Sequence, residues 1–205
     1  MARCRNICRE ALFKSRAKCE VVGDTAPLHV ALADASEREG DIEQAIAEFR
    51  KASRLDPSLA GAHLGAGRLL WSYRRFEEAE PELLAELKLN PGSIELKYYL
   101  GCLYLHTNDT ARAIPLLEGF VRARPQAQNG YFELGSALIK ENKTDRAIWA
   151  FEKAVSMGPG EANLHYALAR AYRAAGRAQD AQKEFDITKR LLAQRSIHDI
   201  QTLNK

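Results

Sequence analysis

A proline recurs at a fixed interval along most of the chain. Pro57, Pro91, Pro125 and Pro159 are each separated from the next by 34 residues. Proline lacks a backbone N–H and pushes the residue before it out of the helical region, so each of these prolines ends one unit and lets another begin. A constant interval of this size indicates a tandem array of small modules that stack on one another.

Small and large apolar residues recur with the same interval. One column is invariant, with Ala45, Ala79, Ala113, Ala147 and Ala181. A second column holds only small residues, namely Ala33, Gly67, Gly101, Gly135 and Ala169. A third holds large apolar residues, namely Phe49, Leu83, Leu117, Phe151 and Phe185. Small residues let two helix backbones approach closely and large ones fill the space beside them, so each unit is predicted to be a pair of packed helices.

The apolar spacing gives the bounds of these helices. The first helix of each unit is expected over 27–39, 61–73, 95–107, 129–141 and 163–175. The second helix is expected over 43–55, 77–89, 111–123, 145–157 and 179–192. The predicted organisation is a basic N-terminal segment over 1–25, helical or disordered; a repeat domain over 26–193 with units 26–59, 60–93, 94–127, 128–161 and 162–193; and a C-terminal tail or end of a capping helix over 194–205.

With this period and these columns, the sequence resembles the tetratricopeptide repeat (TPR) family over about residues 26–193. The resemblance implies an all-α fold, a right-handed α-solenoid (superhelix) of stacked antiparallel helix hairpins. It also implies a non-catalytic protein–protein interaction scaffold, which binds a peptide segment of a partner in its concave groove.

Some positions depart from the pattern. Glu86, Phe120 and Thr188 replace the small residue near the end of the second helix, so the stack is expected to be less regular around the second and third units. The second unit has Tyr73-Arg74-Arg75 between its helices, where other units have residues suited to turns, and we expect a less regular turn there. The last unit lacks the closing proline, so its second helix is expected to continue further.

The residues that could carry chemistry do not form a site. His29, His63 and His165 fall in one column, where the family usually has a bulky residue packing inside the hairpin, and zinc would need its ligands within about 2.1 Å. The four cysteines include no Cys-x-x-Cys pair and are interpreted as reduced thiols. Phosphate-loop, metalloprotease and serine-hydrolase motifs are absent from the sequence. We therefore expect no enzyme, no metal and no cofactor.

In the TPR family the first helix of each unit lines the inner groove. Projected onto this chain, the family pattern gives a set of residues that the packing columns do not use, rich in the aromatic residues and arginines that are enriched at binding hot spots. The expected partner-binding residues of the concave face are Leu64, Arg68, Trp71, Tyr98, Cys102, Leu105, Phe132, Ile139, Tyr166, Arg170 and Arg173.

Some family members bind acidic C-terminal tails of chaperones through a clamp of Lys, Asn and Arg. The matching positions here hold Val30, Asp34, Gly65, Glu95 and Tyr99, so that clamp is absent. The expected partner is instead a protein or peptide with apolar side chains and an acidic group near Arg68 or Arg170. The chain itself is expected to be a monomer or a weak homodimer.

Charge and hydropathy indicate whether the chain binds nucleic acid or enters a membrane. Residues 1–24 contain six Lys or Arg and three Asp or Glu, and because the whole chain has a formal charge of +3, the rest is neutral, which argues against nucleic acid as the partner. No apolar run reaches the roughly 20 residues that span a bilayer, so no membrane insertion is expected, and a cytoplasmic location is favoured.

The alternative to an independent scaffold is the repeat region of a larger enzyme or of an envelope or secretion assembly factor, with its effector domain missing upstream of the basic start.

Overall fold

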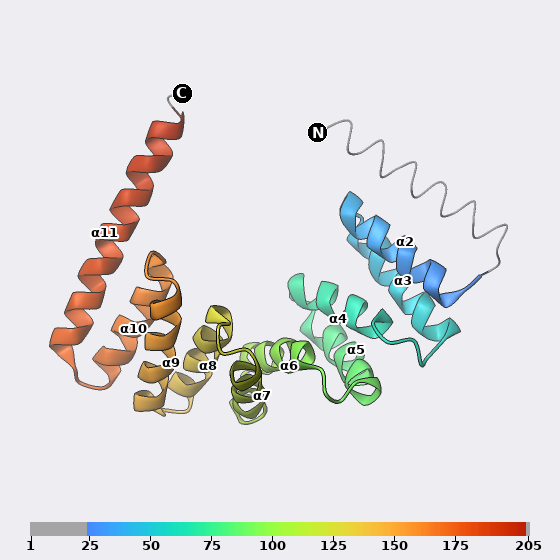
Figure 1. The fold of residues 1–205 in the computed structure, drawn as a ribbon, viewed down its shortest axis with the longest axis horizontal. Helices are drawn as coiled ribbons and strands as arrows, with labels where there is room; N and C mark the ends of the chain where they lie inside the picture. Colours follow the sequence, from blue (N-terminus) through green and yellow to red (C-terminus); the bar gives the residue numbers. More distant parts are fainter. Residues whose placement is uncertain (1–23, 204–205) are drawn as a thin grey trace. The chain divides into compact units, whose positions relative to one another are not determined.

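The computed structural model describes residues 24–203, with side chains over 24–196, and in that range it contains helices joined by short turns and no strand (Figure 1). The helices are α2 (Ala26–Glu39), α3 (Ile42–Leu55), α4 (Ala62–Ser72), α5 (Phe76–Leu89), α6 (Ile94–His106), α7 (Thr110–Ala123), α8 (Gln128–Lys140), α9 (Thr144–Met157), α10 (Ala162–Ala174) and α11 (Ala178–Leu203). The all-α prediction is confirmed. Each expected helix begins and ends within one residue of its observed bounds, except that α11 runs on to Leu203.

The chain divides into two compact units with a boundary inside α6. Unit 1 ends at Tyr99 and unit 2 begins at Leu100. In unit 1, α2 pairs with α3 and α4 with α5, and α3 packs against α4. In unit 2, α8 pairs with α9 and α10 with α11, while α7 packs on α8 and α9 on α10. Each unit is therefore built of helix hairpins that bury their apolar sides on one another.

The small-residue column allows the two helices of a hairpin to touch. A Cβ atom added to Gly67 would lie 2.7 Å from a side-chain atom of Leu83. An equivalent contact of 2.7 Å would join Gly135 to Phe151. Real Cβ atoms essentially never come so close, so glycine sets the separation of the helices at these positions.

The turns inside the hairpins share one backbone geometry. One residue of each turn has a positive φ. It is the residue directly after the first helix for Gly40 at 85°, and the second residue after it for Arg74 at 60°, Asn108 at 64°, Asn142 at 56° and Gly176 at 75°. In each turn the next backbone N–H bonds back to a carbonyl near the helix end, as Arg75 does to Leu70 at 2.9 Å. The prediction of a less regular turn at 73–75 was therefore wrong, because Arg74 adopts the left-handed conformation that glycine or asparagine adopts in the other turns.

Two departures from the small column have a physical explanation in the structure. Glu86 is 2% exposed, and its carboxylate accepts hydrogen bonds from the backbone N–H groups of Gly61 at 3.0 Å and Leu64 at 3.3 Å. It thus serves the first turn of α4, whose amides have no partner within the helix. Phe120 packs on Gly130 of α8, where an added Cβ would lie 2.6 Å from the ring.

The last helix is the longest in the described part of the chain. It occupies Ala178–Leu203 and is the red helix of Figure 1. None of the described helices combines the length and apolar character needed to cross a lipid bilayer. The predicted basic N-terminal segment spans residues 1–25, and its residues 1–23 lie outside the described part of the chain.

Candidate functional site

Unit 2 has a groove of about 700 Å³ between α8 and α10. Five of the predicted binding residues line it, namely Phe132, Ile139, Tyr166, Arg170 and Arg173. The remaining lining residues are Ser136, Lys140, Phe151, Asn163, Ala167, Ala171 and Ala174. A volume of this size falls in the range of sites that bind ligands or inserted side chains.

Aromatic rings form much of this groove. Phe132 on α8 meets Phe151 on α9 edge to face, with ring centroids 5.9 Å apart. Tyr166 on α10 meets Phe185 on α11 in the same way, also at 5.9 Å. Tyr166 is nevertheless 48% exposed, so much of its ring remains open to a partner. Rings fixed in this manner offer large apolar contacts at little cost in side-chain entropy.

The groove also carries positive charge. The guanidinium of Arg170 lies 6.0 Å from the ring centroid of Tyr166, and that of Arg173 lies 5.6 Å from the ring centroid of Phe185. Both arginines are exposed, and in the described part of the chain neither forms an ion pair. Lys140 is held at one side, where its Nζ donates to the backbone carbonyl of Leu105 at 2.9 Å. The groove is therefore apolar at its base and cationic at its edge.

The predicted residues of unit 1 lie in a different environment. Arg68 forms a two-pronged ion pair with Glu37, with nitrogen–oxygen distances of 2.9 Å and 2.6 Å. These hydrogen bonds raise the pKa of Arg68. The guanidinium is thus already neutralised within unit 1, unlike those of Arg170 and Arg173.

Trp71 belongs to an aromatic cluster in unit 1. Its ring centroid lies 6.4 Å from that of Tyr98 and 5.4 Å from that of Tyr99. The indole Nε1 is buried and has no hydrogen-bond partner among the described residues. Leu64, on the preceding turns of the same helix, is half-buried. These residues form an apolar patch beside the Arg68–Glu37 pair.

Two of the predicted binding residues are buried and do not reach a surface. Cys102 is 1% exposed and Leu105 is 4% exposed. The physical reason is that α6 is apolar around most of its circumference over 100–105, and such a helix is enclosed rather than amphipathic. Period alone placed both residues in an inward column, and it did not distinguish an enclosed helix from one with a free face.

Sequence reasoning also missed groove residues. Phe151 belonged to a packing column, and the structure shows that its ring both packs against Gly135 and lines the groove. Lys140 and Asn163 lie near the ends of their helices, and the inward columns did not include them. A signal was present for Lys140, since it follows Ile139 on a helix already assigned to the groove.

The three histidines each face a glutamate of the partner helix in the same hairpin. His63 lies 2.8 Å from Glu82, and His165 lies 2.6 Å from Glu184. His29 pairs in the same way with Glu48 at 2.5 Å, and its other ring nitrogen lies 2.6 Å from Asp24. Hydrogen bonds from Lys51 and His29 lower the pKa of Asp24. Over residues 24–196 no group of three or more His, Cys, Asp or Glu side chains is arranged to hold a metal ion.

Family models described as tetratricopeptide repeat match almost all of the described chain. The matches cover residues 30–94, 64–128, 98–162 and 138–201. Overlapping matches of this kind are expected from a tandem array, in which any two neighbouring units satisfy the same model.

Known proteins point the same way. The mouse protein O-mannosyl-transferase TMTC3 is 29% identical over 176 residues, which are 78% of this chain and 19% of that protein. The chain spans about a fifth of the length of the curated relatives it matches. Among solved structures, MamA from Desulfovibrio magneticus RS-1 has a TM-score of 0.79 at 24% identity, covering 84% of this chain and 97% of that one. YrrB, titled a TPR protein with an unusual peptide-binding site, has a TM-score of 0.78 at 23% identity, covering 86% and 91%.

The structural likenesses, at this level of identity, show the fold, and they confirm the predicted class of α-solenoid built of helix hairpins. The family matches cover far more than half of the sequence. The chain belongs to the tetratricopeptide repeat family, whose fold serves as a scaffold for protein–protein interaction.

Proposed function

We propose that the chain is a non-catalytic scaffold that binds a peptide segment of a partner protein in the groove between α8 and α10. The observation that carries the proposal is the combination, in one groove of about 700 Å³, of exposed aromatic surface and two arginines that form no ion pair with any described residue. Apolar side chains of the segment would lie on Phe132, Ile139 and Tyr166. An acidic group of the segment would pair with Arg170 or Arg173.

The physical balance supports a groove of this composition. Aromatic residues and arginines are enriched at interface hot spots. Aromatic rings bury large areas at little cost in side-chain entropy, and arginine offers several donors to a carboxylate. An arginine that already pairs within the protein, as Arg68 does, would give up one ion pair to form another and gain little. A flexible segment loses entropy when it becomes ordered, so the affinity should be modest.

Unit 1 is proposed to contribute a second, apolar contact surface. Leu64, Trp71 and Tyr98 present half-buried side chains there, beside the neutralised Arg68. This surface is suited to apolar side chains and not to an acidic group. Cys102 and Leu105 are left out of the proposal because they are buried.

The groove is tested by affinity capture with the whole chain as bait, followed by mass spectrometry. Proteins captured by the wild type should be reduced about tenfold or more with Tyr166→Ala or Arg170→Glu, the size of change expected for a hot-spot residue. Both side chains are exposed, so the variants should fold, which circular dichroism would check. Ser156→Ala, at an exposed position of α9, is the matched control. Unchanged capture by both groove variants would rule out this groove.

A second candidate is that these repeats are the binding region of a longer protein, such as a larger enzyme or an envelope or secretion assembly factor. The observation that favours it is that the curated relatives are about five times as long as the part they share with this chain. Reading the gene upstream of the Met1 codon decides it. An in-frame domain supports this candidate, and an in-frame stop codon removes it.

A further inference from the structure

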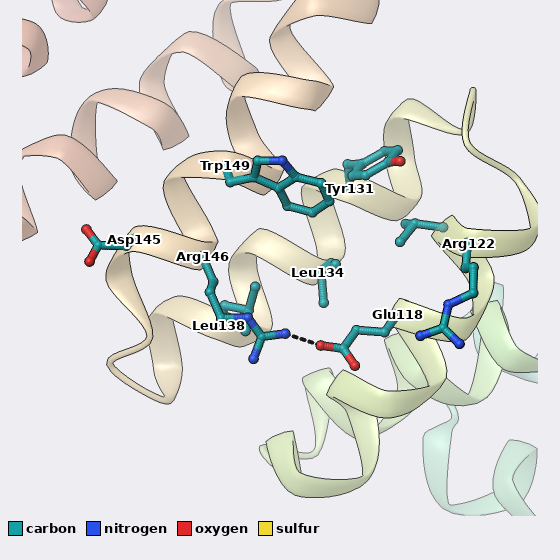
Figure 2. Close-up of a pocket in the computed structure, with 9 residues that line it drawn as sticks. Glu118, Arg122, Tyr131, Leu134, Leu138, Asp145, Arg146 and Trp149 are labelled. Carbon is teal, nitrogen blue, oxygen red and sulfur yellow. Dashed lines mark hydrogen bonds and ion pairs between the residues drawn. The ribbon is translucent and has the colours of Figure 1, made fainter.

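A second pocket lies on the other side of α8 from the groove. It has a volume of about 730 Å³ and is shown in Figure 2. Its lining residues are Glu118, Val121, Arg122, Tyr131, Leu134, Leu138, Asp145, Arg146 and Trp149. None of them lines the groove between α8 and α10. On α8, the pocket residues Leu134 and Leu138 point about opposite to Phe132 and Ser136, as helical geometry requires for these spacings.

One side of this pocket is apolar and partly exposed. Leu134 and Leu138 are almost fully buried and form its base. Trp149 on α9 is 47% exposed and meets the ring of Tyr131 edge to face, with centroids 5.7 Å apart. Figure 2 shows these two rings along one side of the pocket, Arg146 and Glu118 along the other, Arg122 at the right, and Asp145 apart from them at the far left. An exposed tryptophan beside an apolar hollow is a typical anchor for a partner's side chain.

The same position in unit 1 is filled by a polar network. There the Nε of Arg50 donates to Glu82 at 2.8 Å, and Glu82 also lies 2.8 Å from a ring nitrogen of His63. Two repeats further along the chain, the positions equivalent to Arg50, Glu82 and His63 hold Glu118, Ala150 and Tyr131, respectively. Ala150 and Glu118 do not repeat this network, because Ala150 has no polar side chain and Glu118 forms an ion pair with Arg146. These positions in unit 2 therefore lack the polar network found in unit 1.

A second relationship between the two units is a reversal of charge. Arg50 on α3 also pairs with Glu78 on α5, at 3.4 Å. The equivalent positions in unit 2 hold Glu118 on α7 and Arg146 on α9, which form an ion pair with the charges exchanged. This pair closes one side of the pocket and neutralises Arg146.

One cation at the rim is still available. Arg122 on α7 is exposed and has no ion pair within the described part of the chain. Asp145, which forms no ion pair within residues 24–196, lies in the first turn of α9, where the helix dipole favours a negative charge. The lining therefore carries two acidic and two basic side chains, and Arg122, the cation without an ion pair, lies at the opposite end of the pocket from Asp145 (Figure 2).

We infer that this pocket binds a second protein segment, which inserts one aromatic or large aliphatic side chain against Trp149 and Tyr131 and places a carboxylate on Arg122. Charge complementarity with Arg122 selects an acidic neighbour for the inserted side chain. The pocket has room for one such side chain and its flanking backbone. The scaffold then carries two binding sites on opposite sides of α8, and two partners can occupy it together.

The experiment is a selection of random peptides displayed on phage against the intact chain. Enriched peptides should carry an aromatic or large aliphatic residue next to Asp or Glu, and they should bind Trp149→Ala at least about tenfold more weakly. Arg122→Glu should reject these peptides and favour ones with Lys or Arg at the acidic position. Both substituted side chains are exposed, and circular dichroism checks that the variants fold.

Direct placement comes from fluorescence. The chain has two tryptophans, so Trp71→Phe leaves Trp149 as the only indole emitter, and peptides bound in this pocket should shift its emission. Tyr166→Ala is the control for the groove and should leave binding of these peptides unchanged. The inference is overturned if no peptide is enriched, if enriched peptides bind Trp149→Ala like the wild type, or if Tyr166→Ala abolishes their binding.

Discussion

Glu86 of α5 caps the first turn of α4, where its carboxylate accepts a hydrogen bond from the backbone N–H of Gly61 at 3.0 Å. The N-cap residue of α4 is Gly61, which has no side chain that could perform this role. Glu86, which departs from the small-residue column of the repeat, therefore links two consecutive helices of unit 1.

Removing this cap should be costly. Glu86→Ala leaves the N–H groups of Gly61 and Leu64 without their acceptor in a buried place, and an unpaired buried donor costs about 1–3 kcal/mol. We expect urea unfolding to show a loss of that size. Glu77→Ala, at an exposed position in the first turn of the same helix, should change the free energy of unfolding by less than about 0.5 kcal/mol. Equal effects of the two substitutions would contradict the capping role.

The turn at Arg74 should be improvable. Left-handed backbone costs a residue with a Cβ about 1–2 kcal/mol, and glycine avoids that cost while losing more entropy on folding. Arg74→Gly is therefore expected to stabilise the fold by about 0.5–1 kcal/mol, even though it removes the contact of Arg74 with the ring of Phe76. Thermal unfolding measures the change. Asn142→Gly, at the equivalent turn, should gain less because asparagine tolerates this conformation. A drop in stability for Arg74→Gly would contradict the strain argument.

Close packing inside the fourth hairpin should not tolerate one added methyl group. Gly135→Ala would place a Cβ 2.7 Å from the ring of Phe151, and overpacking of this kind costs about 1–3 kcal/mol. Since Phe151 also lines the groove, displacement of its ring should weaken binding there as well. Gly160→Ala, which would meet nothing within 4 Å, is the control and should be near neutral in denaturant unfolding. A neutral Gly135→Ala would show that the helices can separate without cost.

Glu133 should make stability depend on pH. Burial raises the pKa of this carboxyl above its ordinary value of 4.5, so the folded chain holds the proton more tightly than the unfolded chain. The resulting stability is present in full below the unfolded pKa and is lost as the pH rises through the folded pKa. Glu133→Gln should therefore be more stable than the wild type at neutral pH, and the difference should shrink on acidification. Unfolding measured across this range tests the sign, and a less stable Glu133→Gln at neutral pH would contradict it.

The fold was predictable because its determinants are periodic. The recurring prolines and the column containing Gly67 and Gly135 mark helix ends and helix contacts in each unit, and the structure shows both. Backbone geometry at Arg74 was not predictable from residue preference, because its own hairpin closes with the same geometry as the four turns that have glycine or asparagine at this position. Here the hairpin geometry outweighed the local preference of arginine.

The candidate site was less predictable because it depends on residues that differ between units. Arg68 and Arg170 occupy one column, yet only Arg68 has an acidic partner, and that partner comes from the preceding hairpin. Similarly, Ala150, next to the pocket residue Trp149 in the chain, stands where unit 1 has Glu82 of its polar network, and it reads as an ordinary small residue. Such features depend on pairs of positions across helices, and a column of single residues does not contain that information.

The exchanged ion pairs, Arg50 with Glu78 and Glu118 with Arg146, bear on how a chain of nearly identical modules assembles in the correct order. If α3 docked on α9, Arg50 would face Arg146, and if α7 docked on α5, Glu118 would face Glu78. Either mistake brings like charges together, while apolar columns alone would accept both arrangements. The order of charges in these two ion pairs thus favours the correct neighbour for each hairpin. A chimera with exchanged hairpins should assemble poorly unless the charged residues are exchanged back.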